Sequence, residues 1–138
     1  MEQNKLNSPW WREIIGIAWP IIAAFVLLKI VTIFYSPSHV DRSEIERAWK
    51  SNDLVLLEFH ASWCSTCLIQ RNVLNDIFKN PEFAGIRRFT LNYDVENQLK
   101  REFRVSSQST LILTRNGKEL SRSVGVVNPS DLKAFLKN

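Results

Sequence analysis

The chain has 138 residues, a net charge of +4 and a hydrophobic content of 45%. This length suits one ordinary domain, and the hydrophobic content is normal for a globular protein. Its 18 Lys and Arg residues against 14 Asp and Glu form no dense basic run, which argues against a nucleic-acid-binding protein.

The first part of the chain holds its longest apolar stretch. Residues 1–13 form a polar tail, and residues 14–35 carry one charge, Lys29, with tryptophans towards one end and Tyr35 at the other. A helix rises about 1.5 Å per residue, so this stretch matches a bilayer core of about 30 Å. We therefore predict a single transmembrane anchor over residues 14–35.

Two other interpretations of this stretch are a cleaved signal peptide and a buried core helix. The stretch is long for a signal peptide, and no small-x-small cleavage site follows it. It is apolar on every side, unlike a helix with one core-facing stripe. Basic residues flank it on both sides, so the positive-inside rule says little. A short leader before an anchor favours a C-terminal domain outside the cytoplasm.

A linker at residues 36–42 leads into alternating helical and extended patterns. Ser43 and Glu46 form a capping-box pattern, which predicts the start of a helix. The mostly apolar run at residues 53–61 predicts a buried strand with Glu58 inside it. Leu54, Leu56, Glu58 and His60 would share one side of that strand.

The remaining patterns predict a helix from Cys64 to about Lys79, a strand at 86–94, a short helix at 95–103, a hairpin around Asn116-Gly117 and a last helix from Asn128. The first of these helices would bury the apolar stripe Leu68, Val73, Leu74, Ile77 and Phe78. The order α-β-α-β-α-β-β-α indicates one α/β domain at residues 43–138, with three layers around a central mixed sheet.

Cys64 and Cys67 are the only cysteines in the chain, and they follow the first strand at the start of a helix. A helix N-terminus presents free N–H groups and the positive end of its dipole, which favour a thiolate at the first cysteine. The second cysteine lies on the same helical face. We therefore expect Cys64 to be an exposed nucleophile and Cys67 the resolving thiol of a redox-active pair that needs no other cofactor.

Two alternatives exist for this cysteine pair. A structural zinc site normally needs four ligands, and only His39 and His60 are available besides the cysteines, neither at ligand spacing. An inert disulfide closing so short a loop would restrict the unfolded chain very little. The sequence therefore predicts no metal ligands within the chain.

Glu58 is a candidate for proton exchange with Cys67. It lies six residues before Cys64 in an apolar strand, where burial raises the proton affinity of a carboxyl group. The alternative is that Glu58 is a strand-end residue that reaches solvent.

The stretch EFHASWCSTC, together with Leu91-Asn92, Asp94 and FRVSSQSTLILTRNGKEL, resembles the thioredoxin family over about residues 40–138. The resemblance implies a thioredoxin-like fold and thiol–disulfide exchange with protein disulfides, with Cys64, Cys67 and Glu58 in the family's roles. Trp63, Gln108 and Ser109 would then shape the substrate-binding surface. A thioredoxin-like domain on a membrane anchor is similar to the periplasmic reductase modules of DsbD-type electron carriers. This resemblance implies that the protein lies in the inner membrane with its domain in the periplasm, and that an electron donor of the DsbD/CcdA type reduces it.

Several positions depart from this resemblance. Ser109 stands where the family has a cis-proline, so the peptide before it is either cis at a cost or trans with a rebuilt loop. Thr90 stands where many thioredoxins have a lysine beside the buried acid, which implies a Glu58 without a cationic partner. The family's first strand is replaced by the linker, and Asn72 replaces a helix-kinking proline.

The sequence is compatible with three functions. The favoured one is a membrane-anchored thiol–disulfide oxidoreductase, with Ser65 and Thr66 between the cysteines favouring a reducing or intermediate potential. The alternatives are a non-catalytic interaction domain and a metal- or iron–sulfur-binding module, the latter permitted by Ser109.

Overall fold

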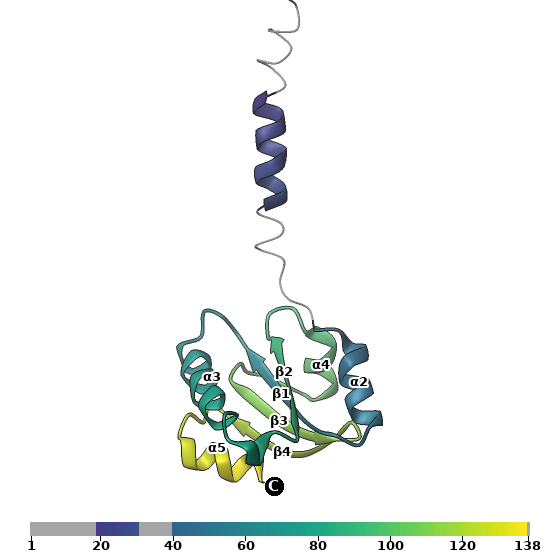
Figure 1. Ribbon diagram of the computed structural model, residues 1–138, viewed down its shortest axis with the longest axis vertical. Coiled ribbons are helices and arrows are strands. Elements are labelled where there is room, and N and C mark those ends of the chain that lie inside the picture. The colour runs from purple at the N-terminus through teal and green to yellow at the C-terminus, as the bar shows by residue number, and fades with distance from the viewer. Residues whose placement is uncertain (1–18, 31–39, 138) are drawn as a thin grey trace, which may run out of the picture. The chain divides into compact units, whose positions relative to one another are not determined.

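The structure is a computed structural model that describes residues 19–30 and 40–137 (Figure 1). The chain divides into two units, Met1–Ser36 and Pro37–Asn138. The second unit contains the cysteines and every strand among the described residues.

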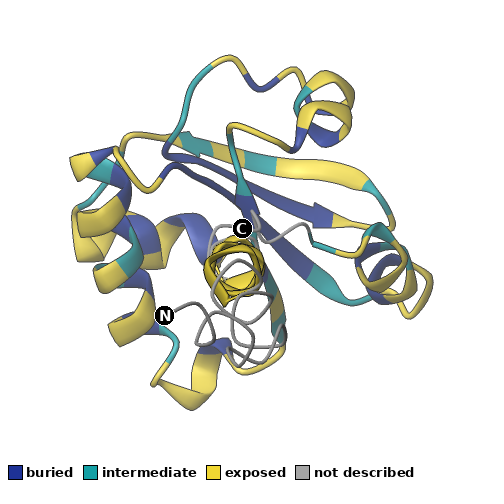
Figure 2. Cartoon of the chain, turned by 90° about the horizontal axis from the view of Figure 1, so that it is seen from above, coloured by how far each residue is buried: buried dark blue, intermediate teal, exposed yellow. Residues whose placement is uncertain are grey.

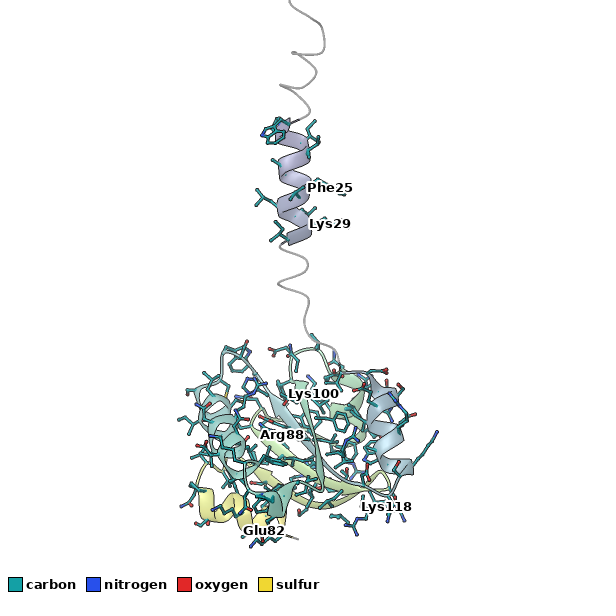
Figure 3. All side chains as sticks on the ribbon, in the orientation of Figure 1. Phe25, Lys29, Glu82, Arg88, Lys100 and Lys118 are labelled. Atoms are coloured by element: carbon teal, nitrogen blue, oxygen red, sulfur yellow. The ribbon has the colours of Figure 1, made fainter. Side chains whose placement is uncertain are left out.

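In the first unit, residues 19–30 form a helix with exposed apolar side chains. The ammonium group of Lys29 lies 5.6 Å from the centre of the Phe25 ring, and both side chains are labelled in Figure 3. Both ends of the predicted anchor, residues 14–18 and 31–35, lie outside the described residues. Within the described ranges, no helix combines the length and the apolar character needed to cross a bilayer.

The second unit follows the predicted order of helices and strands. Its elements are α2 (Arg42–Lys50), β1 (Leu54–His60), α3 (Ser65–Ile77), the short 3₁₀ helix η1 (Pro81–Phe83), β2 (Ile86–Asn92), α4 (Asn97–Glu102), β3 (Thr110–Arg115), β4 (Lys118–Val124) and α5 (Pro129–Leu136). Only η1 was not expected from the sequence.

One four-stranded sheet of order β2-β1-β3-β4 lies at the centre. Strand β1 is parallel to β2 and antiparallel to β3, and β3 forms an antiparallel hairpin with β4. Asn116 and Gly117 make the hairpin turn with φ values of 53° and 74°, the left-handed conformation that Asn-Gly turns supply. The predicted mixed sheet is confirmed.

Helices cover both faces of this sheet (Figure 1). Val55, Leu57 and Phe59 face one core cluster, which includes residues of α2 and α4. Leu56 faces the other cluster, which includes residues of α3 and α5. In Figure 2 the buried positions lie along the central strands and on the sides of the helices that face the sheet. By alternation, Glu58 lies on the face that α3 covers.

Some expected details of the helices are wrong. Asp41, not Ser43, caps α2: its Oδ1 accepts from the Ser43 backbone N–H at 2.9 Å, and Glu46 instead pairs with Arg42 at 2.9 Å. In α3, Leu68 is 48% exposed, whereas Gln70 is 1% exposed. The local pattern could not show that polar contacts hold Gln70 inside.

Element ends also differ slightly from the predicted ones. Helix α3 ends at Ile77, β2 ends at Asn92 and α4 spans only Asn97–Glu102. Tight turns follow these elements, because the N–H groups of Lys79, Val95 and Arg104 bond to the carbonyls three residues earlier.

Candidate active site

The two cysteines lie where the chain passes from β1 into α3. Cys64 is the N-cap residue of α3, with extended φ and ψ of −92° and 113°. Its Sγ accepts a hydrogen bond from the Cys67 backbone N–H at 3.3 Å, as a polar N-cap side chain does. Both cysteines are free. The predicted thiol at a helix N-terminus is therefore present, as a reduced dithiol.

Ser109 joins the dithiol from a distant part of the chain. Its Oγ lies 3.5 Å from Cys64 Sγ and 2.9 Å from Cys67 Sγ. The residue is 3% exposed, because it lies between the active-site helix and the start of β3. The sequence assigned Ser109 to the substrate-binding surface, and the structure brings its hydroxyl to both sulfurs.

The surroundings of the two sulfurs shift their pKa values in opposite directions. The pKa of Cys64 is lowered to about 7, first by the Ser109 hydroxyl, then by the Cys67 thiol and by the N–H groups of Cys67 and Thr66, while burial opposes the shift. The pKa of Cys67 is raised, chiefly by burial. Cys64 is therefore the thiol that ionises first.

This difference predicts a pH profile for alkylation. Only the thiolate reacts, so the alkylation rate of Cys64 should rise with pH and reach half its maximum near the pKa of about 7, below the value of about 8.5 for a free cysteine. Cys67 should reach its half-maximum at a higher pH than Cys64. Iodoacetamide labelling followed by peptide mass spectrometry separates the two sites. A Cys64 midpoint at or above that of a free thiol would contradict the assignment.

Cys64 is less accessible than the sequence suggested. Cys64 is 9% exposed and Cys67 is 1% exposed. The expected order of exposure holds, but both residues count as buried, because the Ser109 loop lies against them. Ala61 and the partly buried Tyr93 complete this small cluster.

The Ser109 loop is rebuilt around a trans peptide. The peptide bonds of the described residues include no cis bond, and Ser109 has φ 57°. This left-handed conformation is uncommon for a residue with a side chain. The Ser109 carbonyl accepts from the Gly125 N–H at 2.9 Å and from Gln70 Nε2 at 3.3 Å. Of the two geometries considered from the sequence, the trans form is the one present.

Glu58 is buried, as expected, but it is not alone. It is 1% exposed, and its Oε2 accepts from Arg88 Nη2 at 2.6 Å and Nε at 2.9 Å and from Thr90 Oγ1 at 3.2 Å. The inference that Glu58 lacks a cationic partner is wrong, because Arg88 reaches it from two positions before Thr90. Figure 3 labels Arg88 within the domain.

Trp63 and Gln108 directly precede Cys64 and Ser109 in the chain. Trp63 is 64% exposed, and its Nε1 donates to Asp94 Oδ2 at 2.9 Å. Gln108 is partly buried, directly before Ser109. The three residues that the sequence assigned to substrate binding, Trp63, Gln108 and Ser109, therefore lie on segments next to the dithiol.

Sequence reasoning missed Arg88 and Gln70. Arg88 alternates with the buried Phe89 on β2 and shares the face of Thr90, so alternation offered a signal. Gln70 lies three residues after Cys67, on the same side of the helix. That spacing was also readable, although it did not reveal that Gln70 is buried.

Comparison with known proteins agrees with this geometry. The family model described as Thioredoxin matches residues 38–138. A thioredoxin of Haemophilus influenzae is 31% identical over 100 residues, which cover 71% of this chain and 92% of that protein. The crystal structure of Trxlp from Edwardsiella tarda is 39% identical with a TM-score of 0.68, and the match covers 71% of this chain and 95% of that chain. A Malassezia sympodialis thioredoxin structure at 22% identity shares the fold, with a TM-score of 0.63 over 70% of this chain and 86% of that chain.

Proposed function

The chain belongs to the thioredoxin family, and from this premise we propose a membrane-anchored reductase of disulfides in proteins outside the cytoplasm. The family and its fold establish thiol–disulfide oxidoreductase activity. The observation that carries the proposal is the free dithiol at the start of α3, in which the pKa of Cys64 is lowered and that of Cys67 is raised.

The proposed reaction has two steps. The Cys64 thiolate attacks one sulfur of a substrate disulfide, forms a mixed disulfide and releases the other substrate sulfur as a thiolate. Cys67 then loses its proton and attacks Cys64 Sγ, which releases the second substrate thiolate and leaves a Cys64–Cys67 disulfide. The substrate gains two electrons, and the redox-active pair supplies them without another cofactor.

The exposed indole of Trp63 and the Gln108–Ser109 segment border the dithiol, and we assign them to substrate contact. Proton exchange between Glu58 and Cys67 stays a prediction. One observation favours it: Glu58 Oε1 is buried and, among the described residues, has no hydrogen-bond partner.

The proposed anchor is residues 14–35, which places the domain at a membrane. Its support is the apolar sequence with a single charge, Lys29, and the exposure of large apolar side chains in its described part, from 44% at Ile30 to 69% at Trp19. We propose the inner membrane with the domain in the periplasm, and an electron donor of the DsbD/CcdA type to reduce Cys64–Cys67 again.

The residues between the cysteines bear on the reduction potential of the pair. Ser65 and Thr66 provide no cation that would stabilise a thiolate strongly, and stabilised reduced forms make strong oxidants. We therefore propose a reducing or intermediate potential.

Both parts of the proposal are tested on membranes from cells that express the full chain. The protein should stay in the membrane pellet after an alkaline wash, because an apolar anchor is not removed by breaking ionic contacts. Equilibration with dithiothreitol redox buffers should give Cys64–Cys67 a potential nearer to about −270 mV than to about −120 mV. Release into the supernatant would contradict the anchor, and a potential at the oxidising end would contradict the reductase.

A further inference from the structure

The Ser109 hydroxyl contacts both sulfurs of the dithiol, at 3.5 Å from Cys64 Sγ and 2.9 Å from Cys67 Sγ. A serine hydroxyl carries one proton and two lone pairs. It can therefore donate to one sulfur while it accepts from the other, but it cannot donate to both at once. The sulfur that carries the negative charge attracts the hydroxyl proton.

The charge changes place during the proposed reaction, on which this inference rests. In the reduced protein Cys64 ionises first, so the Ser109 hydroxyl donates to Cys64 and accepts from the Cys67 thiol. Once Cys64 is bonded to the substrate, its sulfur is neutral. Cys67 must then become the thiolate, in a buried position where an unsolvated charge is unfavourable.

We propose that the Ser109 hydroxyl stabilises the two thiolates in turn, first Cys64 and then Cys67, and that Gln70 is the residue that positions it. Only rotation about the Cβ–Oγ bond is needed to redirect the proton, because Oγ already lies within contact distance of both sulfurs. A hydrogen bond to the charged form favours that form.

In the resolving step, every proton, bond and electron pair has a defined destination. The Cys67 proton leaves by the exchange proposed for Glu58 and passes from there to solvent, and the Ser109 hydroxyl proton points to the new thiolate. The bond between Cys67 and Cys64 forms as the bond between Cys64 and the substrate sulfur breaks. The electron pair leaves on the substrate sulfur, which takes up a proton from solvent, so that Ser109 ends unchanged.

Gln70 fixes the backbone that carries this hydroxyl. Its side chain is 1% exposed, and Nε2 donates to the Ser109 carbonyl at 3.3 Å and to the Val126 carbonyl at 2.8 Å. The Gly125 N–H donates to the same Ser109 carbonyl at 2.9 Å. Gln70 thus ties α3, the Ser109 loop and the end of β4 together behind the dithiol.

The conformation of Ser109 explains why such support is needed. With φ at 57°, Ser109 occupies a region that residues with side chains rarely adopt. Its carbonyl would otherwise be a buried acceptor with one fewer partner, which is unfavourable. A polar side chain inside the apolar side of α3 is therefore accounted for by the loop it holds.

Glu58 does not provide the same contact. Its hydrogen bonds go to Arg88 and Thr90, and among the described residues it makes none to either cysteine. Stabilisation of the Cys67 thiolate by a direct hydrogen bond from a neighbouring side chain therefore falls to Ser109.

The first test removes only the hydroxyl. Ser109→Gly keeps the backbone conformation, since glycine adopts positive φ freely. In the full chain, the pKa of Cys64 should rise by about one to two units, the effect of losing one hydrogen bond to a charged group. It is measured from the pH dependence of thiolate absorbance.

The second measurement follows Cys67 in the mixed disulfide. Cys64 is first linked to a coloured aromatic thiol, thionitrobenzoate, and its release by Cys67 is followed in a stopped-flow instrument across pH. In Ser109→Gly the midpoint of this profile should also move up by about one to two units. Below the midpoint the release should slow by about three- to tenfold, because a smaller thiolate fraction is partly offset by higher nucleophilicity.

Gln70→Met tests the positioning role. Methionine has similar length and no amide donor, so both pH midpoints should rise, by less than in Ser109→Gly. Leu74→Ala is the matched control: it removes a buried side chain from the same helix and lowers stability, but it touches neither Ser109 nor the sulfurs. Its two midpoints should stay at the wild-type values.

Two results would overturn the roles assigned to Ser109 and Gln70. If Ser109→Gly shifts the Cys64 midpoint and leaves the release profile unchanged, the hydroxyl serves one sulfur only and the proposal fails. If Gln70→Met matches Leu74→Ala, Gln70 has only a packing role and its assignment fails. These readings concern thiol ionisation alone, so an oxidising potential would overturn the proposed reductase without changing them.

Discussion

Replacing Cys64 with serine is expected to lower the reduction of insulin disulfides to the uncatalysed rate, a loss of about three orders of magnitude or more. A serine hydroxyl does not ionise near neutral pH, so the first attack on the substrate disulfide cannot occur. Serine is a good N-cap residue, and α3 should therefore keep its N-terminus. The measurement is the rate of insulin precipitation with dithiothreitol as the electron source.

Cys67→Ser should give a different result, because its Cys64 can still attack. The mixed disulfide then lacks a resolving thiol and should accumulate as a covalent complex on non-reducing gels. Ser62→Ala, an exposed substitution beside the motif, is the control and should keep the wild-type rate within about twofold. Turnover by Cys64→Ser at the rate of this control would refute the assigned nucleophile.

Replacing Arg88 with methionine is expected to lower the free energy of unfolding by about 3 kcal/mol at neutral pH, near the lower end of the range for breaking a buried ion pair. The Glu58 side chain is 1% exposed and that of Arg88 16%, so the carboxyl group would be left buried without its cation. The loss includes the hydrogen bond from Arg88 Nη1 to Asn75 Oδ1 at 2.7 Å. Urea denaturation followed by tryptophan fluorescence measures the change.

The ion pair between Lys79 and Asp76 supplies a matched control. Its N–O distance is also 2.6 Å, but its side chains are 77% and 73% exposed. Lys79→Met should therefore change the free energy of unfolding by less than about 1 kcal/mol. The double substitution Glu58→Leu with Arg88→Met should recover much of the stability, because no buried charge remains. Equal losses at Lys79 and Arg88 would show that burial does not strengthen the Glu58 pair.

The fold class was predictable because its signals are local. The mostly apolar run at residues 53–61 predicted the central strand, the Asn116-Gly117 turn predicted the hairpin, and Pro129 marked the start of the last helix. Element ends were less accurate, since turns that tighten the chain depend on single hydrogen bonds. The capping residue of α2 was misplaced by two positions because Asp41 and Ser43 both suit an N-cap.

The partner of Glu58 could not be found in the same way. Opposite Glu58 in the sheet register lies Thr90, whereas Arg88 lies opposite Leu56. The resemblance drew attention to position 90, while the long Arg88 side chain reaches the carboxyl group diagonally across the two strands. Finding this pair requires the register of β1 against β2 and the conformation of the Arg88 side chain, and both depend on the tertiary structure.

The sequence by itself determined the spacing of Cys64 and Cys67, their place at a helix start and the α/β class, because each depends on residues within one or two turns of each other. The tertiary structure decided which side chains meet the sulfurs and the buried acid. Ser109 and Gln70 are 39 residues apart and Arg88 and Glu58 are 30 apart. Such contacts form only when the sheet order and helix packing bring distant segments together, which no local pattern encodes.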